Sequence, residues 1–490
     1  MTGVDRTRRD GQRSAGAWPS VPSVRRPRAV AGDPLRVAAV VGVGVYAVTL
    51  GWLAQRGHDV TGAVLLASVL LLVVIPVLVR VGRRDGTPGV VPLLVGGYVA
   101  KLVASAVRYL VAFDVYDGVA DAAAYHRVGT DVAARIWSGS LSFQVGRVPG
   151  TGAIEVVTGV IYSAILPSLG GGFVAFATIA YAGQVLAWRA FRVGVPHGNG
   201  RRYAALVLLL PSLLFWPSSI GKEAWMMLAL GGCALGAAHL VTGSRRAWPL
   251  LLLGLAAAYA VRPHIAMLVL VSLVVTVALR PGARHRSPPV VRFVGTIALL
   301  ALTALLLVRV QSYFGVESAG LDLGASEVFD AAATQTAQGG SSFEPVGATN
   351  PLLAPVAAAS VLYRPLPFEA ANAQMALASL EGLVLLGLTV RYRANLVAAL
   401  RSLSSRRYVL FSVVYLALFV VAFSSIENFG ILVRQRTQVL PFFLVLLCVD
   451  LPVPRRPVAR RGAARTAGPV AVRGRAAASP APAVRDRVHL

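Results

Sequence analysis

The chain has 490 residues, of which 56% are hydrophobic and 14% charged, and its mean hydropathy of +0.67 excludes an ordinary soluble protein of this length. The formal net charge of +26 comes from arginines clustered beside apolar runs, a positive-inside pattern that explains the charge without a nucleic-acid partner. Cys233 and Cys448 both lie inside apolar runs, which argues against a disulfide framework and a cysteine-ligated metal.

Two basic segments flank the apolar part of the chain. Residues 1–35 are rich in Arg, Ser and Pro and contain no apolar core, so we expect a disordered cytoplasmic tail rather than a signal peptide. Residues 451–490 are rich in Pro, Ala and Arg and have no periodic apolar face. We expect this second tail to be disordered too, and to lie on the cytoplasmic side near anionic lipid.

Residues 36–450 carry apolar runs that are long enough, or nearly long enough, to cross a membrane as helices. The runs lie at about 36–54, 61–80, 89–112, 170–189, 203–217, 224–242, 248–261, 265–280, 291–309, 371–390, 408–424 and 434–450. Every second connection is basic, which places both tails in the cytoplasm. The sequence therefore predicts an all-α, polytopic integral membrane protein with about twelve transmembrane helices.

The first long outer loop, about 113–150, is acidic and contains a helical pattern. Within 119–137, Tyr125, Val128, Val132 and Ile136 recur at helical intervals, which predicts a helix lying on the membrane surface. The apolar run at 152–166 follows. A span there would place the basic connection between Arg189 and Arg202 outside, so we interpret the run as a re-entrant or interfacial helix.

The second long outer loop, about 310–370, has a composition that changes along its length. It opens acidic, passes through the Gly/Ser/Thr-rich stretch 334–349, and ends in the sequence Tyr-Arg-Pro-Leu-Pro-Phe-Glu at 363–369. A polar, glycine-rich middle of this kind is suited to become ordered over a bound substrate.

A lysine and a glutamate stand together where one predicted span ends and the next begins at the outer face. Lys222 and Glu223 belong to the stretch 211–225, and charges at the mouth of a membrane cavity are costly unless paired or functional. A purely structural interpretation remains open. In it, Ser218 or Ser219 caps the next helix, Glu223 complements its dipole, and Lys222 extends toward the headgroups.

A second candidate group lies in the first outer loop. Asp117, Asp121 and Tyr125 are spaced one helical turn apart, which would direct two carboxylates and a phenol to one place. Such a carboxylate can deprotonate a sugar hydroxyl if burial or a neighbouring carboxylate raises its pKa toward neutrality. The alternative is a solvated helix face. For His126 we expect an interfacial hydrogen bond rather than metal ligation, because no second histidine lies at ligand spacing.

Several outer-side arginines run against the positive-inside trend. Arg262 precedes His264 in Val-Arg-Pro-His, Arg364 precedes Glu369, and Arg434 and Arg436 end the stretch Asn-Phe-Gly-Ile-Leu-Val-Arg-Gln-Arg. The planar guanidinium binds phosphate oxygens in a bidentate manner, so such a group would suit a lipid-linked phosphate or diphosphate. The alternative is that each arginine separately extends to outer headgroups.

The stretches around Asp121 to His126, around Lys222 and around Arg262 to His264, taken in order, resemble those of membrane glycosyltransferases of the C superfamily, in a poorly characterised bacterial branch. The resemblance covers roughly residues 36–450. Members have an acidic first outer loop with an amphipathic helix, and arginines near the last spans. This chain departs from the superfamily in that Asp117 and Asp121 are four residues apart where the acidic pair is often adjacent, and in lacking a soluble domain after the last span.

The resemblance implies transfer of a sugar from a polyprenyl-phosphate donor, at the outer side of a bacterial cytoplasmic membrane. Asp121, with Asp117, would be the base on the acceptor hydroxyl. The remaining candidates, Tyr125, His126, Lys222, Glu223, Arg262, His264, Arg364, Glu369, Arg434 and Arg436, would bind substrate, and the cationic ones would hold the phosphate. A divalent metal ion is compatible with carboxylates and phosphate oxygens, but the sequence does not require one.

Two other functions fit parts of the same pattern. A polysaccharide polymerase or ligase that joins polyprenyl-diphosphate-linked repeats would also have many spans, a large outer loop and outer arginines. A transporter of an anionic lipid or solute would need broken helices in two related halves, and the sequence shows no convincing internal repeat. For a glycosyltransferase or a polymerase, the expected partners are membrane lipid and a lipid-linked sugar.

Overall fold

The computed structural model describes residues 57–279 apart from 119 and 245–247, residues 343–451 apart from 349 and 351, and a few isolated positions before residue 57. Several expected features lie outside the described residues. They are the tail 1–35, nearly all of the span 36–54, the span 291–309, the part of the second outer loop up to residue 342, and the tail beyond Leu451. The elements described below all belong to one structural unit within Met1–Asp450.

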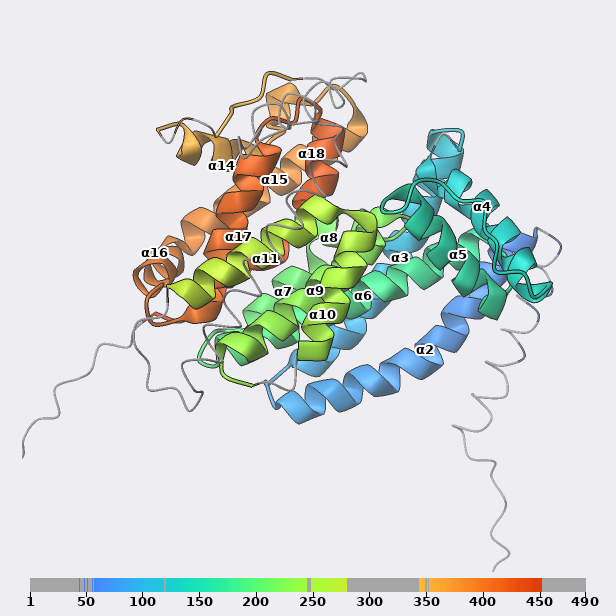
Figure 1. Ribbon diagram of the computed structural model, residues 1–490, viewed down its shortest axis with the longest axis horizontal. Helices are drawn as coiled ribbons and strands as arrows, with labels where there is room; N and C mark the ends of the chain where they lie inside the picture. The colour runs from blue at the N-terminus through green and yellow to red at the C-terminus, as the bar shows by residue number, and fades with distance from the viewer. Residues whose placement is uncertain are drawn as a thin grey trace, which may run out of the picture. The chain divides into compact units, whose positions relative to one another are not determined.

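Helices make up the ordered elements of the described ranges, and no β-strand occurs in those ranges (Figure 1). The first half contains α2 (His58–Asp85), α3 (Val90–Leu110), the π-helical turn η1 (Val111–Val115), α4 (Asp121–Trp137), α5 (Thr151–Ile165), α6 (Leu169–Gly194), α7 (Gly200–Leu209), α8 (Pro211–Phe215), α9 (Lys222–Val241), α10 (Trp248–Val261) and α11 (Pro263–Ala278). The second half contains α14 (Ala354–Tyr363), the 3-10 turn η3 (Pro367–Glu369), α15 (Ala373–Arg391), α16 (Arg393–Arg401), α17 (Arg407–Phe423), α18 (Phe429–Arg436) and α19 (Leu440–Cys448).

Five of the described helices are long and apolar enough to cross a membrane: α2, α3 with η1, α6, α9 and α15. The pair α18 and α19 would add a sixth span if its two parts, bent by 56°, cross together. By length and composition these helices identify an all-helical membrane protein. The 15-residue α5 is shorter than a straight span, which fits a re-entrant or interfacial helix.

Two of the expected spans are broken helices. The run at 203–217 divides into α7 and α8 because Pro211 lacks an amide hydrogen and forces Leu210 into an extended conformation (φ −63°, ψ 129°). The run at 434–450 divides into α18 and α19, with Pro441 in the first turn of α19. The sequence predicts a span in each place but not the interruption, because apolar composition does not encode where the backbone hydrogen bonds are broken.

The centre of the bundle is the contact between α6 and α9, which run side by side and have the most extensive contact among the described elements (Figure 1). Glycines allow this approach. A Cβ added to Gly183 would lie 2.2 Å from the carbonyl oxygen of Met227, so the backbones touch where a larger residue would hold them apart. At the periphery, α2 exposes Val69, Leu72 and Val73, as a lipid-facing helix should.

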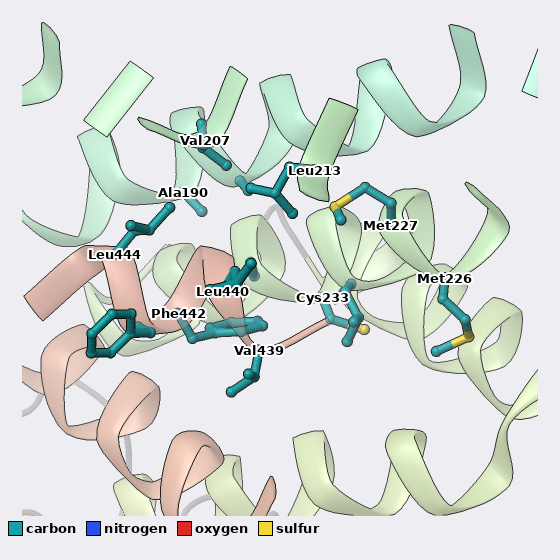
Figure 2. Packing of buried hydrophobic residues seen from close by; sticks show 14 of the residues in the cluster. Ala190, Val207, Leu213, Met226, Met227, Cys233, Val439, Leu440, Phe442 and Leu444 are labelled. Carbon is teal, nitrogen blue, oxygen red and sulfur yellow. The ribbon is translucent and has the colours of Figure 1, made fainter. Parts of the chain in front are cut away.

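Helix α19 packs into the same core. Figure 2 shows Val439, Leu440, Phe442 and Leu444 beside Ala190, Val207, Leu213, Met226, Met227 and Cys233. Because α19 contacts α6, α7 and α17, it fixes the second half of the chain against the first half. Helix α18, which directly precedes α19, is thereby held close to α9.

The break between α7 and α9 is stabilised by buried polar side chains. Lys101 of α3 is fully buried, and its Nζ donates hydrogen bonds to the carbonyl oxygens of Leu213 (2.8 Å) and Leu214 (3.2 Å). Gln184 of α6 donates to the carbonyl oxygens of Val207 (2.8 Å) and Leu213 (3.3 Å). Carbonyl groups left open by a helix break cost free energy in an apolar interior, so these donors explain why an intramembrane lysine is tolerated.

Candidate functional site

A cavity of about 510 Å³ lies where the ends of several helices meet. Its lining comes from α3, η1 and the residue after it (Arg108, Ala112, Tyr116), from α4 and the residue before it (Ala120, Asp121, Ala122, Tyr125) and from α6 (Phe173). The segment before α9 adds Trp216, Ser219, Ile220 and Gly221, and the first turn of α9 adds Lys222 and Glu223. The remaining lining residues are Arg262, Gln374, Asn428, Gly430, Ile431, Arg434 and Gln435. The structure therefore brings together Asp121, Tyr125, Lys222, Glu223, Arg262 and Arg434, which the sequence placed in three separate groups.

Glu223 is the centre of the charged network. Its Oε1 accepts hydrogen bonds from Arg262 at 3.0 Å and from Arg434 at 3.3 Å, and Arg434 also reaches Asp121 at 3.4 Å. Glu223 and Arg262 have side chains that are 7% and 9% exposed, whereas the side chain of Asp121 is 68% exposed. One buried carboxylate thus orients two guanidinium groups, and a second, accessible carboxylate lies at the edge.

The start of α9 places Lys222 and Glu223 in the first helical turn. Gly221 is the N-cap residue, and no side chain donates or accepts a capping hydrogen bond there. The structural alternative in which Ser218 or Ser219 caps this helix is therefore wrong. The carboxylate of Glu223 still lies favourably at the positive end of the helix dipole, in addition to its pairing with the two arginines.

Two cations of the lining have no carboxylate partner among the described residues: Lys222 and Arg108. The guanidinium carbon of Arg108 lies 4.9 Å from the ring centroid of Phe215 and 5.0 Å from that of Trp216. Its Nε is buried and, within the described part of the chain, has no hydrogen-bond partner. Stacking on two rings holds the guanidinium at the wall of the cavity.

Arg108 is the one charged residue among the described lining residues that the sequence did not single out. It lies near the end of the predicted span 89–112, where a single arginine looks like ordinary interfacial anchoring. The available signal was its position inside an apolar run, because a charged residue in a membrane-spanning segment is a candidate for function.

Tyr125 contributes a neutral donor. Burial raises the pKa of this phenol, and the nearby carboxylates of Asp121 and Glu223 raise it further, so the hydroxyl stays protonated. The ring is 4% exposed and lies on the same helix as Asp121, as the helical spacing predicted.

Uncharged polar groups complete the lining. Tyr116 donates a hydrogen bond of 2.8 Å to Oε1 of Gln374, and Asn428 and Gln435 also line the cavity. Side-chain amides both donate and accept hydrogen bonds, and Trp216 adds an aromatic face. The cavity therefore combines an anion-binding wall with groups suited to hydroxyls.

Asp117 lies outside this arrangement. Helix α4 begins at Asp121, and Asp117 precedes it in a turn with a left-handed backbone (φ 49°). It does not line the cavity. The expectation that Asp117 and Asp121 share one helix face is wrong, because the helix has not yet started at Asp117.

The two histidine candidates do not line the cavity. His126 lies on α4, and its Nδ1 is 2.7 Å from the hydroxyl oxygen of Tyr162. Burial lowers the pKa of His126, although Asp59 opposes the shift. The ring of His264 is 6.0 Å from that of Phe423 in the interior beyond Arg262. The predicted hydrogen bond of His126 is confirmed, and the role of both histidines as substrate ligands is not supported by their position.

Arg364 and Glu369 form a pair with each other. Nε of Arg364 lies 2.8 Å from Oε1 of Glu369, and the guanidinium stacks over Phe343 (4.5 Å) and Phe429 (5.2 Å). Burial alone would raise the pKa of Glu369, but hydrogen bonds from Arg364 and from the amide of Leu366 outweigh burial and lower it. Neither residue lines the cavity, so their expected direct role in substrate binding is corrected to fastening the second outer loop against the start of α18.

Arg436 is also a structural residue. It is fully buried, and its Nη1 donates hydrogen bonds to the carbonyl oxygens of Leu362 (2.9 Å) and Arg364 (3.0 Å) at the end of α14. Arg434 and Arg436 are two positions apart on α18 and therefore point to different sides of the helix. Only Arg434 reaches the cavity, which corrects the expectation that both bind phosphate.

A metal site is not evident within the described residues, where no group of three or more His, Cys, Asp and Glu side chains gathers. Comparisons of the chain with protein-family models, with characterised proteins and with solved structures gave no significant match.

Proposed function

We propose that the protein is a membrane glycosyltransferase that moves a sugar from a polyprenyl-phosphate-linked donor to a glycan, lipid or protein of the cell envelope. One observation supports a phosphate-bearing ligand. Among the described residues, the cavity lining holds four cations and two carboxylates, and the carboxylates pair with Arg262 and Arg434, whereas Arg108 and Lys222 form no ion pair there.

An excess of two positive charges in a partly buried cavity favours an anionic ligand, because unpaired charges are costly away from water. A phosphodiester that links a lipid to a sugar carries one negative charge, and the phosphate released on transfer carries a second. The excess therefore favours the leaving phosphate over the intact donor, which is what stabilisation of a developing charge requires.

The two carboxylates suit different roles. Asp121 is accessible and would accept the proton of the acceptor hydroxyl, whereas Glu223 is occupied by two arginines and would position them. As the acceptor oxygen bonds to the anomeric carbon, the bond from that carbon to the phosphate oxygen breaks, and its electron pair passes to the phosphate. Direct displacement of this kind inverts the anomeric configuration. Tyr125, Gln374 and Asn428 line the cavity and would hydrogen-bond sugar hydroxyls in this proposal.

We further propose twelve spans with both tails cytoplasmic, and a cavity on the outer face of a bacterial cytoplasmic membrane. The distribution of arginines supports this orientation. Phe173, near the start of α6, lines the cavity, whereas Arg192 lies in the last turn of the same helix, and α2 also ends with Arg83 and Arg84. The basic ends would then face the cytoplasm.

A second candidate function is transport of a phosphorylated lipid. The two broken helices favour it, since α7 and α8 lead into the cavity at Trp216 and α18 lines the cavity directly. Discontinuous helices that meet at an ion or substrate site are common in transporters. A polymerase that uses lipid diphosphates shares the charge argument and differs in the product formed.

The test is transfer of labelled sugar from a synthetic polyprenyl-phosphate sugar by the purified, full-length protein in lipid nanodiscs. The wild type should form a new glycosidic bond, and Asp121→Asn should bind the donor but not transfer it. A chain that moves the lipid between leaflets of liposomes without forming a glycosidic bond would be a transporter instead. A deletion strain that accumulates single lipid-diphosphate repeats would identify a polymerase.

A further inference from the structure

A second cavity, of about 360 Å³, lies between the last turns of α6 and α9 and the first turn of α17. Its lining consists of Gly194, Val195, Pro196, His197, Val241, Thr242, Ser405, Arg406, Arg407 and Tyr408. It is separate from the first cavity, with which it shares no residue. Val195, Val241 and Tyr408 are buried and form its apolar part, and the arginines, His197 and the two hydroxyls form its polar part.

No acidic side chain balances the positive charge of this cavity among the described residues. Its lining contains two arginines and no Asp or Glu, and no ion pair of Arg406 or Arg407 occurs among the described residues. Nη1 of Arg406 is buried and lacks a hydrogen-bond partner within that part of the chain. Arg192, near the same end of α6, shows the contrast, because it pairs with Asp85 at 3.0 Å.

The backbone adds to the positive potential. Arg406 is the N-cap residue of the 17-residue α17, no side chain caps this end, and its first turn contains no acidic residue. Cations at a helix N-terminus oppose the helix dipole, and open amide groups there bind anions. Two arginines in this position raise the free energy of the unliganded chain, and a bound anion would lower it.

The second cavity lies at the opposite end of the bundle from the first. In α6, Phe173 lines the first cavity and Gly194 the second. In α9, Lys222 lines the first cavity and Val241 the second. A helical rise of 1.5 Å per residue separates each pair by about 30 Å, which equals the thickness of the hydrocarbon core of a membrane. The second cavity therefore lies at the level of the headgroups of the other leaflet.

We propose that this second cavity binds a phosphate-bearing anion, held by the guanidinium groups of Arg406 and Arg407. A phospholipid headgroup and a soluble phosphate compound offer the same chemistry, and the position at headgroup level suits either source. The site is independent of the reaction carried out in the first cavity.

Native mass spectrometry of the full-length protein in detergent tests the proposal. The probes are phosphatidic acid, phosphatidylcholine with the same acyl chains, and inorganic phosphate. The pocket variant is Arg406→Gln with Arg407→Gln. The matched control is Arg393→Gln with Arg401→Gln, which removes two exposed arginines from the adjacent α16. Ser405→Glu keeps both arginines and places a carboxylate at an exposed position beside them. It tests the same site even if the double variant fails to fold.

The wild type and the control should bind phosphatidic acid equally and phosphatidylcholine more weakly. The pocket variant and Ser405→Glu should bind phosphatidic acid at least about tenfold more weakly, since a charge-assisted hydrogen bond contributes that much to an affinity. If inorganic phosphate competes with phosphatidic acid, the ligand is a soluble phosphate compound. If it does not compete, the ligand is a lipid. Equal binding by the wild type, the pocket variant and Ser405→Glu, or equal loss in the control, would overturn the proposal.

Discussion

Glu223 and Arg262 are 39 positions apart in the chain and form a buried ion pair of 3.0 Å at the first cavity. Glu223 lies in the first turn of α9, and Arg262 lies between α10 and α11, so the pair ties the beginning of one helix to the junction of the next two. Because Arg434 shares the same carboxylate oxygen, the position of two cavity arginines depends on this one acidic residue.

Replacement of Glu223 by Gln should destabilise the protein and abolish transfer. Removal of one partner of a buried ion pair leaves the other charge uncompensated, which costs about 3 to 5 kcal/mol. The melting temperature in detergent measures the first effect and sugar transfer the second. Glu344→Gln is the control, because Glu344 is exposed and outside the cavity. An unchanged melting temperature for Glu223→Gln would contradict the pairing.

Replacement of Asp121 by Asn should reduce the rate of transfer about 100-fold to 10,000-fold, the usual contribution of a general base. Asp117→Asn should leave the rate unchanged, since Asp117 precedes α4 and does not line the cavity. Single-turnover kinetics with saturating donor compare the two variants. Equal losses in both would show that the acidic pair acts as a unit, contrary to the structure.

Arg434 and Arg436 should respond differently to replacement by Gln. Arg434→Gln should impair transfer about 100-fold or more with little loss of folded protein, because this side chain reaches the cavity. Arg436→Gln should lower the melting temperature, because the carbonyl groups of Leu362 and Arg364 lose their donor, at a cost of about 1 to 3 kcal/mol each. Thermal unfolding and sugar transfer are measured on the same preparations. Equal changes in melting temperature and in transfer rate for the two variants would refute the distinction.

Arg108 should contribute to donor affinity. Its stacked guanidinium has no carboxylate partner among the described residues, so Arg108→Gln should raise the KM for the donor about 10-fold to 100-fold. Arg127→Gln removes an exposed arginine from α4 and serves as the control for general charge effects. An unchanged KM in Arg108→Gln would leave phosphate binding to Lys222 and Arg434.

His126 should make stability depend on pH. Burial lowers the pKa of His126 below the usual 6.5, so the unfolded chain binds the proton more readily than the folded one. The contribution of the neutral His126 to the free energy of unfolding is fully present above pH 6.5. It is lost as the pH falls from 6.5 toward the lower pKa of His126 in the folded protein. His126→Gln should lessen this fall. Melting temperatures measured from pH 5 to pH 8 test the prediction. The same fall in melting temperature with pH for the variant and the wild type would contradict it.

The sequence by itself determined the class of protein, because apolar length and the placement of arginines are local properties. It located α2, α3, α6, α9 and α15 within a few residues, and it singled out the start of α9 and the amphipathic helix that carries Asp121 and Tyr125. Spacing of this kind needs only the period of a helix and the thickness of a membrane.

Only the tertiary structure decided which charged residues meet. The charged residues of the first cavity come from five separate segments, represented by Arg108, Asp121, the adjacent Lys222 and Glu223, Arg262 and Arg434. Arg436 is as prominent in the sequence as Arg434, yet its side chain is buried in the protein interior. The physical reason is that an ion pair forms wherever the packing of whole helices brings two side chains within about 4 Å, and that packing depends on contacts such as those of Gly183 and α19 that carry no charge signal.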